Sequence, residues 1–392
     1  MHPPSNEPRK HNPIGTLAGA AFLAVSWTWC IGMFLPILLV RDFGPWAFLV
    51  FALPNIVGAA AMGWVLSTRE FAARLVTLHR PALEAFSIVT IAFHIYWITW
   101  LSSWVATSLH LDRVSLTIVL LLAIAAFALL ITRPSRSLVA IALPIWLLSA
   151  AVFIALTFHT KSVIPTPALE TLPTGLLWLA PICIFGFALC PYLDLTFHAT
   201  RLSLTARQSR IAFTLGFGFF FAAMILLTLA YAPFIDERIS PRVLPTWIAA
   251  AILFHLLIQA SFTIAAHRRA TTPMLIPEKF AWGFWVLAAL AAIIASRLPE
   301  HSGISAGELG YRLFMSFYGL VFPAYVWLVM IPTRIATPAA RRKTIRVCAA
   351  AVGIAAPMFW MGFIERQEIW LGFGLAVVIL ARLFLPRRAA LQ

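Results

Sequence analysis

The sequence predicts an all-α polytopic membrane protein with about twelve transmembrane helices, and three observations support that fold class. Of the 392 residues, 61% are hydrophobic and only 11% are charged, far below the roughly 25% charged content of ordinary soluble domains. Apolar runs of about 20 residues, enough to cross roughly 30 Å of hydrocarbon, recur along nearly the whole chain. The basic residues lie mainly in alternate connections between these runs, as the positive-inside rule predicts.

The expected spans, numbered in chain order, are joined by connections too short to hold a soluble domain. They cover residues 15–40, 44–67, 84–108, 115–132, 137–158, 174–198, 211–235, 245–266, 280–296, 312–332, 345–364 and 369–385. We expect a cytoplasmic tail at 1–14, a first five-helix repeat at 15–158, a second at 174–332, two accessory transmembrane helices at 345–385 and a cytoplasmic tail at 386–392.

The charge distribution orients the chain. With the N-terminus in the cytoplasm, 21 of the 29 Lys and Arg residues fall on the cytoplasmic side. The net charge of +15 is therefore a topology signal and an attraction to anionic lipid headgroups, and it requires no nucleic-acid partner. We expect a multi-pass protein of a bacterial inner (plasma) membrane with both termini cytoplasmic. Its partners are the lipid bilayer and a small-molecule solute.

Span 6 carries the most informative residue, Asp194, in an otherwise apolar segment. An ionised carboxylate costs roughly 2.5–3.5 kcal/mol at mid-bilayer, so an acid at this depth is usually functional. Gly186 and Pro191 in the same span predict a broken helix with freed carbonyls beside the acid. Asp194 would then bind a coupling proton, a cation or an amino group of the solute. The structural alternative is that Asp194 caps a helix or pairs with Arg201.

Span 1 has a similar interruption at Gly32 and Pro36. Five spans separate the starts of spans 1 and 6, so the two cross the membrane in opposite directions, as the first helices of two inverted repeats do. The candidate substrate-binding residues are Trp27, Thr28, Cys30 and Gly32 from span 1, and Cys190, Tyr192, Asp194 and Thr196 from span 6. The rings of Trp27, Trp29 and Tyr192 would shape the cavity.

Further polar residues lie on other spans. His94 on span 3 could relay protons or bind the solute, and a neutral interhelical hydrogen bond would explain it equally well. On span 8, His255, Gln259 and Thr263 recur at every fourth residue and form a polar stripe, which must face the bundle or a cavity. His94, His255 and Gln259 complete the set of candidate substrate-binding residues.

The twelve spans, the broken first and sixth helices and the run from Gly44 to Gly58 make the chain resemble the amino acid–polyamine–organocation superfamily, nearest to its solute:sodium symporters. The resemblance implies two inverted five-helix repeats in spans 1–10, with spans 11 and 12 as accessory helices. It also implies a sodium ion between broken helix 1 and two hydroxyls on helix 8, for which Ser261 and Thr263 are the matching residues, with Asp194 as a further ion-binding candidate. In that family the hydroxyls are usually adjacent, whereas Phe262 separates these two and turns them about 200° apart.

These observations predict a secondary active transporter that moves a small solute by alternating access. Enzyme signatures such as the Walker phosphate loop and the His-Glu-x-x-His zinc motif are absent, so we expect no enzyme activity, no metal site and no cofactor beyond a coupling Na⁺ or H⁺. A major-facilitator-type transporter is an alternative, although the loop after span 2 lacks that family's Asp-Arg pair. A membrane-embedded enzyme, or a non-transporting sensor or assembly factor, is the other.

Overall fold

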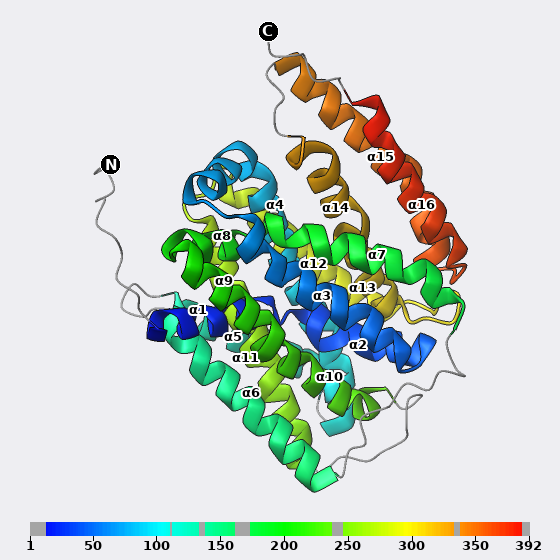
Figure 1. Cartoon of the computed structure of the whole chain (residues 1–392). Helices are drawn as coiled ribbons and strands as arrows, with labels where there is room; N and C mark the ends of the chain where they lie inside the picture. Colours follow the sequence, from blue (N-terminus) through cyan, green and yellow to red (C-terminus); the bar gives the residue numbers. More distant parts are fainter. Residues whose placement is uncertain are drawn as a thin grey trace.

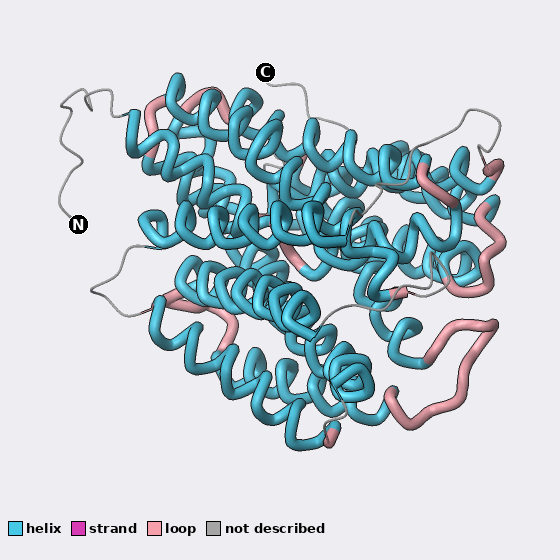
Figure 2. The backbone as a smooth tube through the Cα atoms, turned by 90° about the horizontal axis from the view of Figure 1, so that it is seen from below, coloured by secondary structure: helices cyan, strands magenta, loops and turns pink. Residues whose placement is uncertain are grey.

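The computed structural model describes residues 13–109, 112–132, 138–160, 173–236, 246–332 and 338–385. Over these ranges the chain is almost entirely helical, and its only β pairing is an isolated bridge between His301 and Ile304. Figure 2 shows loops mainly at the ends of the helices. The expected tails at 1–14 and 386–392 lie almost wholly outside the described residues. All four cysteines are free thiols.

The helices follow one another as labelled in Figure 1. The first half contains α1 (Pro13–Trp27), α2 (Cys30–Phe43), α3 (Trp46–Val65), α4 (Arg69–Leu109), α5 (Arg113–Ile131) and α6 (Leu138–Thr160). The second half contains α7 (Gly175–Leu189), a 3₁₀ turn (Cys190–Leu193), α8 (Leu195–Ser203), α9 (Ala206–Leu215), a π-helical turn (Gly216–Phe221), α10 (Ala222–Ile235), α11 (Thr246–Thr271) and α12 (Glu278–Ala295). There follow α13 (Ala306–Ser316), α14 (Phe322–Tyr325) between two π-helical turns (Phe317–Val321 and Val326–Met330), α15 (Pro338–Phe363), α16 (Ile369–Leu380) and a final 3₁₀ turn (Ala381–Phe384).

Nine helices of the described residues are long and apolar enough to cross a membrane, and ten if the bent pair α1–α2 is one span. The two other expected spans correspond to shorter apolar helices at Leu116–Ile131 and Ile369–Phe384. One boundary was wrong by many residues, because α4 begins at Arg69 and not near residue 84. Its first turns carry Glu70, Arg74 and Arg80, so hydropathy alone hides this helical extension.

The broken spans lie in the middle of the bundle. Helix α1 packs against α6 and α9, α3 packs against α7 and α9, and α4 packs against α11, α12 and α8. At the C-terminal edge, α15 and α16 pack against each other, and α16 also touches α7 (Figure 1). The interruptions in spans 1 and 6 are therefore enclosed by α3, α4 and α11.

Candidate functional site

The first interruption separates α1 from α2, whose axes are bent by 55°. Trp29 is extended (φ −80°, ψ 175°), and the Thr28 hydroxyl donates to the Ala24 carbonyl at 2.8 Å, which closes the end of α1. The break therefore lies before Gly32 and Pro36, and both of these residues lie inside α2. Our expectation that Gly32 and Pro36 interrupt the helix was wrong in position.

Two indole groups hold this break. Trp27 Nε1 donates to Asn55 Oδ1 of α3 at 2.7 Å, and Trp29 Nε1 donates to the Ser26 carbonyl. The latter bond satisfies a carbonyl at the end of α1 that has no helical partner there. The break thus coincides with the Trp-Thr-Trp sequence at residues 27–29. The Gly and Pro residues that follow it in the sequence do not interrupt the helix.

His94 caps the second half of span 1. Its Nε2 accepts a hydrogen bond from the Cys30 backbone N–H at 3.2 Å, and its Nδ1 donates to the Thr90 carbonyl at 2.7 Å. Both ring nitrogens are used, and the donor pattern requires the neutral tautomer with the proton on Nδ1. His94 therefore positions the start of α2, and no nitrogen is left over to bind a solute or relay a proton.

The second interruption lies between α7 and α8. After α7 ends at Leu189, the chain makes one 3₁₀ turn, and Asp194 is extended (φ −80°, ψ 111°) before α8 begins. Asp194 Oδ1 accepts bonds from the backbone N–H and the hydroxyl of Thr196, both at 2.7 Å. Asp194 is thus the N-cap of α8, which is half of the structural alternative considered from the sequence.

The other oxygen of Asp194 has a different environment. Asp194 Oδ2 is fully buried without a hydrogen-bond partner and lies 3.8 Å from Nε2 of His267, which also has none. His267 comes from α11, and its Nδ1 lies 3.0 Å from the Ser87 hydroxyl of α4. Sequence reasoning did not select His267. It continues the polar stripe at 255, 259 and 263 by one more step of four, and that spacing was the available signal.

Arg201 does not pair with Asp194. Its guanidinium donates to the carbonyls of Leu66 at 2.6 Å and Ser67 at 2.9 Å, and so fixes the end of α3. Gly186 likewise does not break span 6. It lies inside α7, where a Cβ would come within 2.8 Å of the Tyr318 carbonyl oxygen. This glycine allows close approach of α7 to the π-helical turn after α13.

Aromatic rings fill the point where the two breaks meet. Trp29 packs edge-on against His267 and Tyr318, with ring centroids 5.4 Å and 5.5 Å away. The ring centroids of Trp27 and Trp29 are 4.3 Å apart. The hydroxyls of Ser26 and Thr196 lie 3.4 Å apart and join the two spans. The central cavity measures ≈ 10 Å³ and is lined by Trp27, Trp29, Ile31, Gly32, Asn55, Phe187, Cys190 and Tyr318. That is room for about one water molecule.

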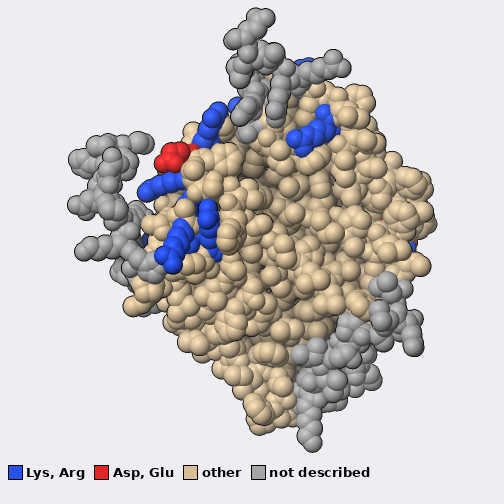
Figure 3. All heavy atoms as spheres, in the orientation of Figure 1, with Lys and Arg blue, Asp and Glu red and all other residues tan. Residues whose placement is uncertain are grey.

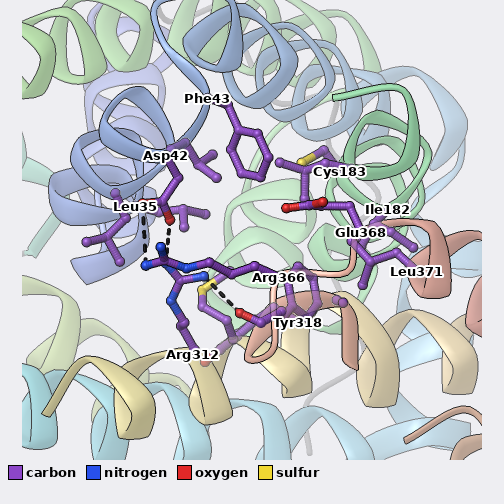
Figure 4. Close-up of a pocket in the computed structure, with 18 of the residues that line it drawn as sticks. Leu35, Asp42, Phe43, Ile182, Cys183, Arg312, Tyr318, Arg366, Glu368 and Leu371 are labelled. Atoms are coloured by element: carbon purple, nitrogen blue, oxygen red, sulfur yellow. Dashed lines mark hydrogen bonds and ion pairs between the residues drawn. The ribbon is translucent and has the colours of Figure 1, made fainter. Parts of the chain in front are cut away.

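A larger cavity of ≈ 330 Å³ lies at the end of the molecule where α2 ends and α7 begins (Figure 4). The sequence predicts that this end faces the outside, and we call the cavity the outer vestibule. Its walls come from α2, α7, α13 and the segment that joins α15 to α16. Phe187 and Tyr318 line both this vestibule and the central cavity, and so form the floor between them. None of the candidate substrate-binding residues of spans 1 and 6 lines the vestibule.

Charged side chains at the vestibule tie α2 to α13. Arg41 contacts Glu308 at 2.6 Å and Asp42 at 2.7 Å, and Arg312 contacts Glu308 at 2.7 Å. The side chains of Arg41 and Glu308 are each only 5% exposed. These ion pairs are therefore desolvated and mutually dependent, and removal of one member leaves the remaining buried charges with fewer partners.

An inner cavity of ≈ 430 Å³ lies at the opposite end. It is lined by α1, α8, α6 and α11, and it reaches Thr196, whose hydroxyl bonds to Asp194. The outer halves of the broken spans, α2 and α7, thus line one cavity, while the inner halves, α1 and α8, line the other. Since these are opposite ends of the two spans in chain order, spans 1 and 6 run in opposite directions, as an inverted repeat requires.

The remaining candidates lie around this centre. Cys190 Sγ donates to the Tyr318 carbonyl at 3.3 Å, and the Tyr192 carbonyl accepts from His198 Nε2 at 2.9 Å. His255 Nδ1 and Gln259 Nε2 both contact the Ser149 hydroxyl of α6, at 2.9 Å and 3.0 Å, and neither lines the three cavities.

Ser261 and Thr263 are buried on α11, which is unbroken there, so the helix does not bring their hydroxyls together. No group of three or more His, Cys, Asp or Glu residues in the described part of the chain could hold a metal ion.

Comparisons with known proteins give a fold and no family. No protein-family model matches the sequence, and no curated protein matches it. Among solved structures, the chain is similar to a manganese transporter from Eremococcus coleocola in complex with an aromatic bis-isothiourea substituted compound. The TM-score is 0.53 at 12% identity, over 97% of this chain and 95% of that chain. A histidine variant of the same transporter gives 0.44 at 13% identity over 97% and 95%. The first likeness shows that the chain has the fold of that membrane transporter.

Proposed function

We propose that this chain is a secondary transporter that carries a small organic solute by alternating access around the junction of spans 1 and 6. The observation that carries the proposal is the arrangement of the cavities. Two cavities approach one aromatic-filled junction from opposite ends, and each is walled by one half of both broken spans. A tilt of the outer or inner halves about the breaks would open the junction to one cavity at a time.

We further propose that Asp194 and His267 together hold the coupling proton. Their facing atoms, Oδ2 and Nε2, are buried and have no other partner. A proton on either atom could be shared across 3.8 Å with a small side-chain movement, whereas an unshared carboxylate would be costly at this depth. The other titratable groups near the pair are His94, which its two hydrogen bonds keep neutral, and Tyr318.

Proton binding at Asp194 can change the structure of the break in span 6 directly. Thr196 bonds to Asp194 Oδ1, lines the inner cavity and contacts Ser26 of span 1. A change of charge on Asp194 therefore alters the cap of α8 and the contact between the inner halves. His267 also touches the ring of Trp29. Protonation of the Asp194–His267 pair is thus coupled to the aromatic rings at the junction through neighbouring side chains.

The proposal does not carry manganese over to this chain. Manganese prefers carboxylate, carbonyl and water ligands, and among the residues that the structure describes Asp194 is the only carboxylate at the junction of the two breaks. The outer vestibule instead presents groups of both charges, including Arg366 and Glu368, above an aromatic floor of Phe187 and Tyr318. Such a surface suits a zwitterionic organic solute, such as an amino acid, better than a metal ion.

Uptake into proteoliposomes tests this function. Vesicles with an inward proton gradient would be supplied with a pool of radiolabelled L-amino acids and, separately, with manganese chloride. We expect gradient-driven accumulation of an amino acid that collapses with a protonophore, and its loss in His267→Gln. The control is His255→Gln, which replaces a second buried histidine on the same stripe of α11; within the described ranges no carboxylate pairs with it. Proton-driven manganese uptake without amino-acid uptake would contradict the proposed solute class, and equal loss in both variants would contradict the role of His267.

A further inference from the structure

A surface groove separate from the transport site runs along the outside of α9 and the π-helical turn that follows it. The groove measures ≈ 690 Å³ and is lined by Trp64 at the end of α3 and by Arg207, Arg210, Ile211, Thr214, Leu215, Gly218 and Phe219. Its two ends differ in chemistry, because the arginines lie in the first turns of α9 and the apolar residues follow toward Phe219.

The π-helical turn explains why the groove is open. A π-helical turn holds more residues than an α-helical turn and shifts the register of the side chains. Phe217, Phe220 and Phe221 are buried here, while Phe219 is 55% exposed and points out of the bundle. A Cβ on Gly218 would meet no atom within 4 Å, so the middle of the groove is unfilled.

The basic end of the groove is preorganised. The guanidinium of Arg210 lies 5.2 Å above the Trp64 ring, whose Nε1 donates to the Thr214 hydroxyl at 3.1 Å. In the described part of the chain, neither Arg207 nor Arg210 forms an ion pair with a carboxylate. Figure 3 shows Lys and Arg side chains gathered over α8, α9 and the start of α4, with one acidic group among them, while the middle of that face is almost free of charge. Two positive charges are therefore available to an anion at this end.

The length of the groove identifies the occupant. From Arg207 to Phe219 the helix rises about 18 Å at 1.5 Å per residue, which lies between the roughly 15 Å depth of one hydrocarbon leaflet and the roughly 20–22 Å depth of a leaflet with its interface. A free phosphate would use only the basic end. We propose that this groove binds an anionic phospholipid of the predicted cytoplasmic leaflet, with its phosphate on Arg207 and Arg210 and an acyl chain along Ile211, Gly218 and Phe219.

Native mass spectrometry of the detergent-purified full chain tests the proposal, with phosphatidylglycerol and phosphatidylcholine as probes. We expect preferential retention of phosphatidylglycerol. The double substitution Arg207→Gln with Arg210→Gln should weaken it about 30-fold, since each basic residue near the surface contributes about 5-fold. Gly218→Leu, which fills the groove without changing charge, should weaken binding of the same lipid although both arginines remain.

Matched controls separate the groove from general electrostatics. Arg342→Gln with Lys343→Gln removes the same charge from exposed positions of the distant helix α15, and Gly353→Leu adds the same side chain at another open helical glycine. Both controls should retain the lipid as the parent protein does. The proposal is overturned if the α15 charge variant loses lipid as strongly as the groove variant, or if soluble glycerol phosphate displaces the lipid at equal concentration. It is also overturned if Gly218→Leu, folded by its melting temperature, binds phosphatidylglycerol unchanged.

Discussion

Replacement of Asp194 by Asn separates a proton-binding role from a structural one. The Oδ1 cap on α8 survives the change, because Asn and Asp are about equally good N-cap residues. The new amide can donate across the 3.8 Å gap to His267 Nε2, which is a free acceptor in one neutral tautomer. We therefore expect the free energy of unfolding to change by less than about 1 kcal/mol, whereas loss of one member of a buried ion pair would cost about 3–5 kcal/mol. Gradient-driven uptake should nevertheless be abolished, because an amide does not titrate.

The assay measures melting temperature, chemical unfolding and gradient-driven amino-acid uptake on the same purified variant. Asp194→Glu provides the comparison, since it keeps a titratable group and should retain some uptake with a shifted pH dependence. Asp194→Ala should cost about 0.5–2 kcal/mol through the lost cap. Full gradient-driven uptake by Asp194→Asn would refute the coupling role. A loss of 3 kcal/mol or more in that variant would refute the neutral shared-proton description.

Four further predictions follow from the structure and the sequence. Glu308→Gln removes one of the three carboxylates that contact Arg41 and leaves Asp42 and Asp236 in place, so it should lower the free energy of unfolding by about 1–3 kcal/mol. In chemical unfolding, Arg41→Gln combined with it should cost less than the sum of the two single substitutions. If Ser261 or Thr263 binds sodium, alanine at either position should raise the sodium concentration needed for half-maximal solute binding, and sodium-independent binding by the parent protein would remove the idea. Hydrogen bonds from Ser302, His301 and Trp360 lower the pKa of Glu365. The contact between residues 301–304 and Glu365 should therefore persist at neutral pH and be lost as the pH falls through that lowered pKa. Faster amide exchange at residues 301–304 would report the loss. Both termini should be cytoplasmic, so a membrane-impermeant reagent should label cysteines placed at 159–173 only from the outer side.

The sequence was sufficient for the membrane class, the spans and the presence of two interruptions. Hydropathy finds spans because the bilayer requires every backbone group to be satisfied within a helix. It missed the first turns of α4, since charged residues such as Arg74 and Arg80 are compatible with a helix outside the hydrocarbon.

The positions of the breaks and the partner of Asp194 were not readable in the same way. Gly32 and Pro36 are tolerated inside α2. The indole of Trp29 closes the break locally on the Ser26 carbonyl, whereas the indole of Trp27 bonds to Asn55 of α3, and that second bond depends on tertiary packing. Likewise, His94 and His267 are both buried histidines on apolar helices. Only their neighbours distinguish a residue with both nitrogens satisfied from one that faces a carboxylate.

Reciprocal labelling tests alternating access most directly and requires no knowledge of the solute. Cys183 lines the outer vestibule, and Ala199 lines the inner cavity, where Ala199→Cys would be a reporter. Right-side-out and inside-out membrane vesicles would be treated with an impermeant maleimide over a range of pH, and each cysteine read by peptide mass spectrometry. We predict that Cys183 is labelled only from outside and Ala199→Cys only from inside. Each rate is divided by the rate for the same cysteine in the unfolded protein at the same pH, because the thiolate is the reacting form, and a change in pH should then move the two normalised rates in opposite directions. Rates that rise and fall together, or both cysteines labelled from one face, would contradict alternating access around the two broken spans.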